Sequence, residues 1–145
     1  MIDSIALWHK RARPNPDHDA FNVQLGCHME EFGEMLASLN GEDGISSNKL
    51  ASMAYQVMQM AEGFKRGAVS AYAEDQVELL DSLADQIVTA VGVGHCAKLN
   101  MVKGVEIVNT SNWSKYDSNG NPLFDENGKI TKGPNYTAPY LKECV

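Results

Sequence analysis

The feature that most constrains the fold is a set of long segments in which apolar residues recur in steps of three and four. Such steps place the apolar side chains on one face of an α-helix. Residues 17–39, 47–66 and 72–98 each carry the pattern. Because three long apolar faces must bury one another, the sequence predicts an all-α fold. The apolar positions are Phe21, Leu25, Met29, Phe32, Leu36 and Leu39, then Leu50, Met53, Ala54, Val57, Ala61 and Phe64, then Val77, Leu80, Ala84, Ile87 and Val91.

The ends of these segments carry residues that start and stop helices. Asp17 or Asp19 can cap the first helix, and Gly41 and Gly67 follow the first and the second as stops. A fourth, shorter helix is predicted over 101–115. Residues 1–16 are a short amphipathic segment followed by a basic loop that two prolines keep out of a regular helix.

The last 30 residues have a different character. Asn119-Gly120 and Asn127-Gly128 are tight-turn dipeptides, and the second is a candidate hairpin turn between 123–124 and 129–130. The sequence therefore predicts a helical domain over 1–115 and a turn-rich tail over 116–145. Two smaller features favour plain packing. These are the glycines of Gly92-Val93-Gly94, which no strand precedes, and the methionines of the second helix, which suit gaps in a core.

Charge and cysteine usage exclude several classes of protein. The net charge is −7, which argues against a grip on a nucleic acid polymer or on an anionic membrane surface. No stretch approaches the roughly 20 apolar residues of a membrane span, and the first residues do not form a signal peptide. The three cysteines are far apart and form no CxxC pair. We therefore expect reduced thiols in a cytoplasmic protein of one domain.

Two clusters of carboxylates are the candidate chemistry. Glu30, Glu31 and Glu34 lie in the first long helix, where Glu31 and Glu34 share one face on neighbouring turns. Glu78, Asp81 and Asp85 lie on one face of the third long helix, at spacing i, i+3, i+7. Like charges on one face repel without a cation, and carboxylate oxygens suit Mg²⁺ or Mn²⁺. The alternative is an ordinary solvated face of each helix.

These residues resemble the MazG-like superfamily of all-alpha nucleotide pyrophosphohydrolases, whose members carry an EExxE helix and then an ExxD helix. Glu30-Glu31-Phe32-Gly33-Glu34 matches the first motif. Ser82-Leu83-Ala84-Asp85 departs from the second, because a serine stands at the glutamate position. Asp81-Ser82-Leu83-Ala84-Asp85 looks more like the DxLAD form of a phage-encoded branch, often described as phosphoribosyl-ATP pyrophosphohydrolase-like. The tail is similar to that branch in its Ser111-Asn112-Trp113-Ser114-Lys115 and Lys132-Gly133-Pro134-Asn135-Tyr136 motifs.

The resemblance implies a four-helix MazG-like bundle that hydrolyses a nucleoside triphosphate to the monophosphate and pyrophosphate. Mg²⁺, or Mn²⁺ in its place, would be held by Glu31, Glu34, Asp85 and either Glu78 or Asp81. Glu30 would be a further ligand or would orient the attacking water, so Glu30, Glu31 and Glu34 are the catalytic candidates. The substrate-binding residues would be Asn109, Asn112, Lys115, Lys132 and Tyr136.

The same resemblance implies a homodimer or homotetramer, and the small Cys27 and Gly33 side of the first long helix fits close packing between subunits. A phage enzyme would act in the host cytoplasm on a deoxynucleotide, with dGTP as one candidate. A ferritin-like di-iron site is disfavoured, because it needs Glu-x-x-His on two helices and His28 precedes Glu31 in the reverse order. The remaining alternative is a non-catalytic binding or assembly protein, for which the departure at Ser82 leaves room.

Overall fold

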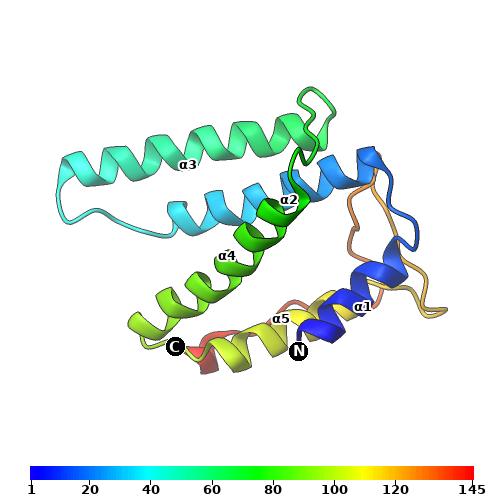
Figure 1. Ribbon diagram of the computed structural model, residues 1–145. Helices are drawn as coiled ribbons and strands as arrows, with labels where there is room; N and C mark the ends of the chain where they lie inside the picture. Colours follow the sequence, from blue (N-terminus) through cyan, green and yellow to red (C-terminus); the bar gives the residue numbers. More distant parts are fainter. The chain divides into compact units, whose positions relative to one another are not determined.

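The computed structural model describes residues 1–145, and it contains five α-helices and no strand (Figure 1). The all-α prediction is confirmed, with one helix more than the four predicted from the sequence. None of the five combines the length and the apolar character that a membrane span requires. The helices are α1 (Ile2–Ala12), α2 (His18–Ala37), α3 (Gly44–Lys65), α4 (Gln76–Cys96) and α5 (Met101–Trp113), and a short 3-10 helix follows at Lys142–Cys144.

The additional helix is α1, which the sequence indicated only as a short amphipathic segment. It spans 11 residues and ends at Ala12, just before the loop that contains Pro14 and Pro16. α1 has a buried apolar face, on which Trp8 and Ala12 lie one turn apart. The prolines therefore act only after the helix has ended.

The other helices begin at side-chain caps. Asp17, Asp43 and Asp75 each accept hydrogen bonds from backbone amides of the first turn of α2, α3 and α4, and Asn100 does so for α5. The predicted cap at Asp17 is confirmed, and its Oδ1 lies 2.8 Å from the Ala20 amide. The cap at Asp75 makes α4 start at Gln76, four residues later than the sequence suggested.

α3 and α4 end in the same backbone motif. After α3, Gly67 has φ +70°, the Gly67 amide bonds to the Phe64 carbonyl and the Ala68 amide bonds to the Gly63 carbonyl. After α4, Lys98 takes the equivalent left-handed position at φ +63°, and the Leu99 amide bonds to the Gly94 carbonyl. These are Schellman motifs, one with the glycine that the motif favours and one with a lysine.

The chain divides into two compact units. The hairpin unit comprises Asn15–Tyr72 and Phe124–Lys129, and the α4–α5 unit comprises Met1–Pro14, Ala73–Leu123 and Ile130–Val145. The tail predicted from residue 116 onward is therefore shared, since its residues 124–129 group with α2 and α3 and the rest group with α5.

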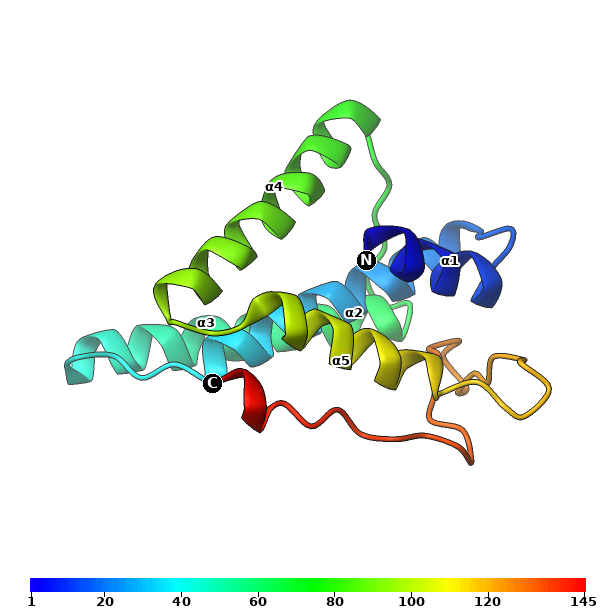
Figure 2. The same ribbon diagram turned by 90° about the horizontal axis from the view of Figure 1, so that it is seen from below.

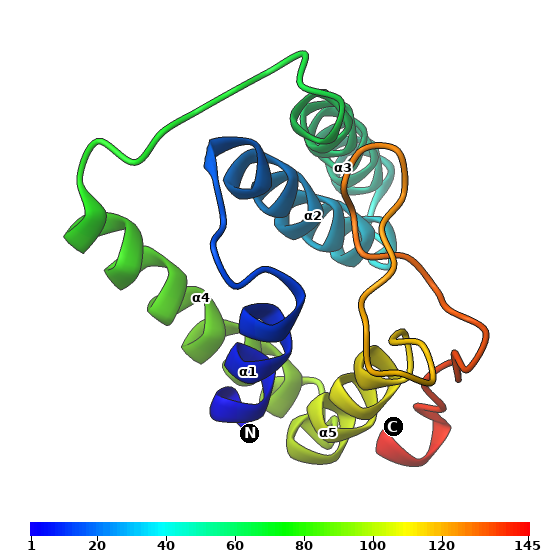
Figure 3. The same cartoon turned by 90° about the vertical axis from the view of Figure 1, so that its right-hand side faces the viewer.

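In the hairpin unit α2 and α3 lie side by side and antiparallel, as the three views agree (Figures 1–3). Glycines permit the contact. A Cβ added to Gly26 would lie 2.7 Å from the Ala61 carbonyl oxygen, and one added to Gly33 would lie 2.7 Å from Met58 Sδ. Gly26 and Gly33 of α2 thus pack on α3 within the chain, and the prediction of a subunit interface stays untested. Met58 packs against Gly33, in keeping with the predicted packing role of these methionines, whereas Met53 and Met60 are exposed.

The core of the α4–α5 unit forms where α1 meets the end of α5 (Figure 3). Trp8, Ala12 and Tyr116 are buried there, with Trp113 and Ile130 packed against them. Trp8 Nε1 donates to the Asn112 carbonyl at 2.9 Å, and the Tyr116 hydroxyl donates to the Trp8 carbonyl at 2.7 Å. Each buried polar group therefore has a partner, and the contact is fixed at both ends.

The last segment of the chain runs back along α5 (Figure 2). The Ser111 hydroxyl donates to the Thr137 carbonyl at 2.7 Å, and the Thr137 amide donates to the Ser114 hydroxyl at 2.8 Å. The amide of Asn100, at the start of α5, donates to the Cys144 carbonyl at 2.8 Å. These bonds hold the segment in place without a strand.

Two successive turns in the tail, at 117–121 and 125–129, have the same construction. In each, the aspartate Oδ1 accepts the amides two and four residues later, and the glycine has φ +76°. In each, the aspartate amide also donates to the carbonyl four residues later. The predicted hairpin is present as the second of these turns, and no strand extends from it.

Candidate functional site

The acidic face of α2 is oriented by the glycines that pack on α3. At about 100° per residue, Gly33 lies within about 20° of Gly26 around the helix. Glu30 then lies about 40°, Glu34 about 80° and Glu31 about 140° from the direction of Gly26. The three carboxylates therefore leave the helix in different settings, from the edge of the α2–α3 contact outward. Glu30 is half-buried, and Glu31 and Glu34 are exposed.

Glu30 is held by two lysines. Lys65 Nζ lies 2.8 Å from its Oε1 and Lys129 Nζ lies 2.6 Å from its Oε2. Burial opposes ionisation of this carboxyl, but the hydrogen bonds from the two lysines outweigh it and lower the pKa of Glu30. Glu30 is therefore firmly ionised, and both of its oxygens are engaged.

The pKa values of the two lysines shift in the opposite direction to that of Glu30. Burial lowers the pKa of Lys65, but its hydrogen bonds to Glu30 and Glu62 outweigh burial and raise the pKa overall. The pKa of Lys129 is raised in the same way, by its bond to Glu30 against the cost of burial. Lys65 has only 12% of its side chain exposed, so this ion pair is stronger than one on an open surface.

The acidic face of α4 has no such compensation. Glu78, Asp81 and Asp85 span about 60° of the helix circumference, on successive turns. All three are exposed, and neither they nor Glu34 form an ion pair. Their oxygens are therefore available to a cation, in contrast to those of Glu30.

The apolar residues of α4 are exposed as well. Leu80 is 69% exposed, Ile87 52% and Val91 47%. α4 meets the rest of its unit near its end, where Gly94 lies against Met101, while Gly92 has open space around it. Close packing is thus confirmed at Gly94 but not at Gly92. The apolar face predicted to be buried is open along most of the helix.

The structure does not assemble a complete metal site. α2 belongs to the hairpin unit and α4 to the α4–α5 unit, so each half of the predicted ligand set is described separately. No group of three or more histidine, cysteine or acidic side chains is gathered at a position that could hold a metal. Either helix alone offers carboxylates of the right chemistry for Mg²⁺ but too few for a full shell.

The five predicted substrate-binding residues all lie in the α4–α5 unit. Asn109 Nδ2 donates to the Ser4 hydroxyl at 2.9 Å, so this amide joins α5 to α1. Asn112 contributes its carbonyl to Trp8, and Lys115 Nζ lies 5.9 Å from the centre of the Trp8 ring.

The other two of these residues form a pair of their own in the tail. Lys132 Nζ lies 4.8 Å from the centre of the Tyr136 ring, in a cation–π contact. In this arrangement the five residues make contacts within the α4–α5 unit, and their roles toward a substrate stay predictions.

Lys65 and Lys129 are the residues that sequence reasoning missed. Lys65 follows the apolar face of α3 at the end of the helix, where a lysine is favoured by the helix dipole and attracts no notice. Lys129 lies 99 residues from Glu30 in the sequence, so no spacing rule connects them. The one available signal was the tight turn at Asn127-Gly128, which presents the next residue in a fixed direction.

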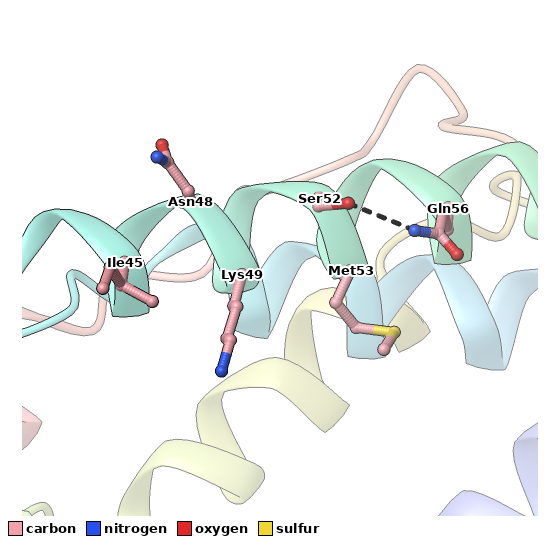
Figure 4. A pocket seen from close by; sticks show the side chains of 6 residues that line it. All are labelled: Ile45, Asn48, Lys49, Ser52, Met53 and Gln56. Carbon is pink, nitrogen blue, oxygen red and sulfur yellow. Dashed lines mark hydrogen bonds between the residues drawn. The ribbon is translucent and has the colours of Figure 1, made fainter.

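A shallow hollow on α3 offers a less specific surface (Figure 4). Its lining residues recur in helical steps along one outward face, and its one internal hydrogen bond runs from Gln56 Nε2 to the Ser52 hydroxyl at 3.1 Å. It contains no carboxylate, so it does not compete with the acidic faces as a metal site. The residues that line it are Ile45, Asn48, Lys49, Ser52, Met53 and Gln56.

Comparison of the chain with protein-family models, with curated proteins and with solved structures gives no match.

Proposed function

We propose that this chain is a metal-dependent pyrophosphohydrolase of the MazG-like type, which converts a nucleoside triphosphate to the monophosphate and pyrophosphate. The supporting observation is that Glu34 on α2 and the three carboxylates of α4 are exposed and unpaired, whereas Glu30 is neutralised by two lysines. Clustered like charges raise the free energy of a folded protein unless a cation compensates them. Each of the two helices therefore presents carboxylates that a divalent cation would stabilise.

The donor set fits Mg²⁺ or Mn²⁺, because all the candidate ligands are carboxylates and none is a thiolate or imidazole. Glu31 and Glu34 would supply the ligands of α2. Asp85 would supply one ligand of α4, and either Glu78 or Asp81 would supply the next. When bound, the metal would neutralise the phosphate oxygens and lower the pKa of a bound water.

The reaction forms a bond from a water oxygen to the α-phosphorus and breaks the bond from that phosphorus to the bridging oxygen of pyrophosphate. Glu30 is a poor candidate for the base that takes the water proton, since both of its oxygens accept from lysines. That role falls to an exposed carboxylate such as Glu34. Lys115 and Lys132 are the proposed cations for the leaving pyrophosphate, whose charge needs compensation.

The test is turnover. The protein is incubated with Mg²⁺ and each canonical dNTP and NTP, and the monophosphate and pyrophosphate are quantified. We expect one nucleotide to be preferred, with dGTP as one candidate. Glu34→Gln and Asp85→Asn should each lower kcat by at least about 100-fold, the scale of a lost transition-state charge contact. Glu106→Gln, an exposed glutamate of α5, is the matched control and should leave the rate unchanged.

Circular dichroism should show the same helix content in all variants. If the protein, at high protein concentration, releases no pyrophosphate from any nucleotide, the proposal is ruled out. Normal rates in both Glu34→Gln and Asp85→Asn would instead show that hydrolysis takes place elsewhere.

The second candidate is a helical binding or assembly protein without catalysis. It is favoured by the exposed apolar face of α4, where Leu80, Ile87 and Val91 offer a surface for a partner. The same surface supports the proposal of a homodimer or homotetramer, which light scattering after size-exclusion chromatography would measure. Turnover separates the two functions.

If the chain is a phage enzyme, it would act on the nucleotide pool in the cytoplasm of its host.

A further inference from the structure

Glu30 differs from Glu34, a second carboxylate of its motif, in that the protein already supplies counter-ions for Glu30. Lys65 Nζ and Lys129 Nζ lie 2.8 Å and 2.6 Å from its two oxygens. Only 19% of the Glu30 side chain is exposed, against 12% for Lys65 and 39% for Lys129. The cluster is therefore a built, half-buried contact and not a chance pairing of mobile surface side chains.

Three separate segments of the hairpin unit converge on this carboxylate. Glu30 comes from the middle of α2, and Lys65 comes from the last turn of α3, where Glu62 also holds it at 3.1 Å. Lys129 comes from the 125–129 turn. Within that turn Asp125 Oδ1 accepts the amide of Lys129 itself at 2.8 Å, so the backbone that carries the lysine is fixed.

A metal ion at Glu30 would have to displace an ammonium group. Each oxygen already accepts a charge-assisted hydrogen bond, and a divalent cation beside two lysines would meet direct repulsion. Glu34 carries the same negative charge one turn away and has no such partner. Glu30 therefore has its charge compensated by lysines and Glu34 does not, although both are glutamates of the same sequence motif.

We propose that Lys65 and Lys129 are positioning residues that hold Glu30 by ion pairs, and we call this three-residue contact the clasp. The clasp joins the 125–129 turn and α3 to α2, and Glu30 is not a metal ligand. Glu31 and Glu34 are then the carboxylates of α2 that take the metal. This inference rests on the proposed function for the metal. It adds that Glu30 has a structural role while Glu31 and Glu34 bind the metal, and that the tail contributes to the structure of the site through Lys129.

The metal side of the proposal is tested with Mn²⁺ alone, whose binding is followed by the loss of the free-ion electron paramagnetic resonance signal. Glu30→Gln and Glu34→Gln remove the same charge one turn apart, so each is the electrostatic control of the other. We expect Glu34→Gln to weaken Mn²⁺ binding by at least about tenfold more than Glu30→Gln. Equal weakening, or a larger effect at Glu30, would overturn the proposal.

Lys129 provides the complementary change. Lys129→Met removes a positive charge and releases one Glu30 oxygen, so Mn²⁺ should bind several-fold more tightly while kcat falls, because the released carboxylate now competes for the metal. Lys129→Arg should restore both values. If Lys129 only contacts phosphate, Lys129→Met would raise KM without changing the affinity for Mn²⁺. If Lys129 has no positioning role, Lys129→Met would change neither value. Either result contradicts the clasp.

Hydrogen exchange separates failure of this inference from failure of the proposed function. In both Glu30→Gln and Lys129→Met, the amides of Asn127, Gly128 and Lys129 should exchange several-fold faster than in the wild-type chain. Unchanged exchange would overturn the clasp whether or not the protein is an enzyme. A wild-type chain that binds no Mn²⁺ and releases no pyrophosphate would overturn the proposed function, with the clasp still judged by exchange.

Discussion

α2 and α4 are nearly equal in length, with 20 and 21 residues, and each carries a cluster of three candidate carboxylates and an apolar face. Their packing is opposite. α2 lies against α3 through Gly26 and Gly33, with no room for a Cβ at either position. α4 has Gly92 in open space and exposes its apolar side chains. An apolar stripe therefore shows that a helix can be buried, while small residues at the contact show where a close neighbour already lies.

The largest expected effect comes from placing one methyl group on each helix. Gly26→Ala should destabilise the protein by about 2 kcal/mol, because its Cβ would meet the Ala61 carbonyl and Lys65. Gly92→Ala should instead stabilise it by about 0.5–1 kcal/mol, since alanine favours the helix and nothing obstructs it. Urea unfolding of the two variants measures both. A loss of stability at Gly92 comparable to that at Gly26 would show that a partner covers this face of α4.

The two Schellman ends sharpen the comparison at a smaller scale. Gly67→Ala should cost about 1 kcal/mol, because φ is +70° at this position and a Cβ is strained there. Lys98→Gly should gain up to about 1 kcal/mol, because the lysine at φ +63° carries that strain already. Thermal unfolding should shift in opposite directions for the two variants, and a shift in the same direction would contradict the equivalence of the two helix ends.

The smallest effect concerns pH. Hydrogen bonds from Lys129 and Lys65, against the opposing effect of burial, lower the pKa of Glu30, and the hydrogen bond from Lys103 lowers that of Glu143. A carboxyl with a lowered folded pKa stabilises the protein above its ordinary pKa, and this contribution is lost as pH falls through the folded value. Stability should therefore decline below about pH 4.5. Glu30→Gln should flatten that decline more than Glu143→Gln, because the Glu143 side chain is 63% exposed, against 19% for Glu30, and is screened by solvent.

Much of the fold could be predicted from the sequence, because helix periodicity and capping are local. The predicted segments contain α2, α4 and α5, and the second overlaps α3, which starts three residues earlier at Gly44. The cap at Asp17 and the stop at Gly67 are confirmed. The sequence indicated only a short amphipathic segment over residues 2–12, because the prolines of the following loop do not show where a helix before them ends. Its apolar positions at Trp8 and Ala12 carried the signal.

The candidate site was less accessible to sequence reasoning. The sequence places the carboxylates on helix faces, and the structure has those faces exposed at Glu34 and Asp85. It could not show that Glu30 is neutralised, because that depends on a tertiary contact between residues 99 positions apart. Nor could the sequence show that the amide of Asn109 bonds to Ser4, because this contact joins two helices that are far apart in the chain.

The two aspartate turns of the tail have a consequence for the order of folding. All of their backbone hydrogen bonds close within five residues, so each turn can form transiently before the rest of the chain folds and is then stabilised by its later contacts. Local turns of this kind form on a timescale of about microseconds, well before contacts between distant segments. Lys129 would then reach α2 on a preformed support, and joining Glu30 would require the ordering of one long side chain and not of a whole loop.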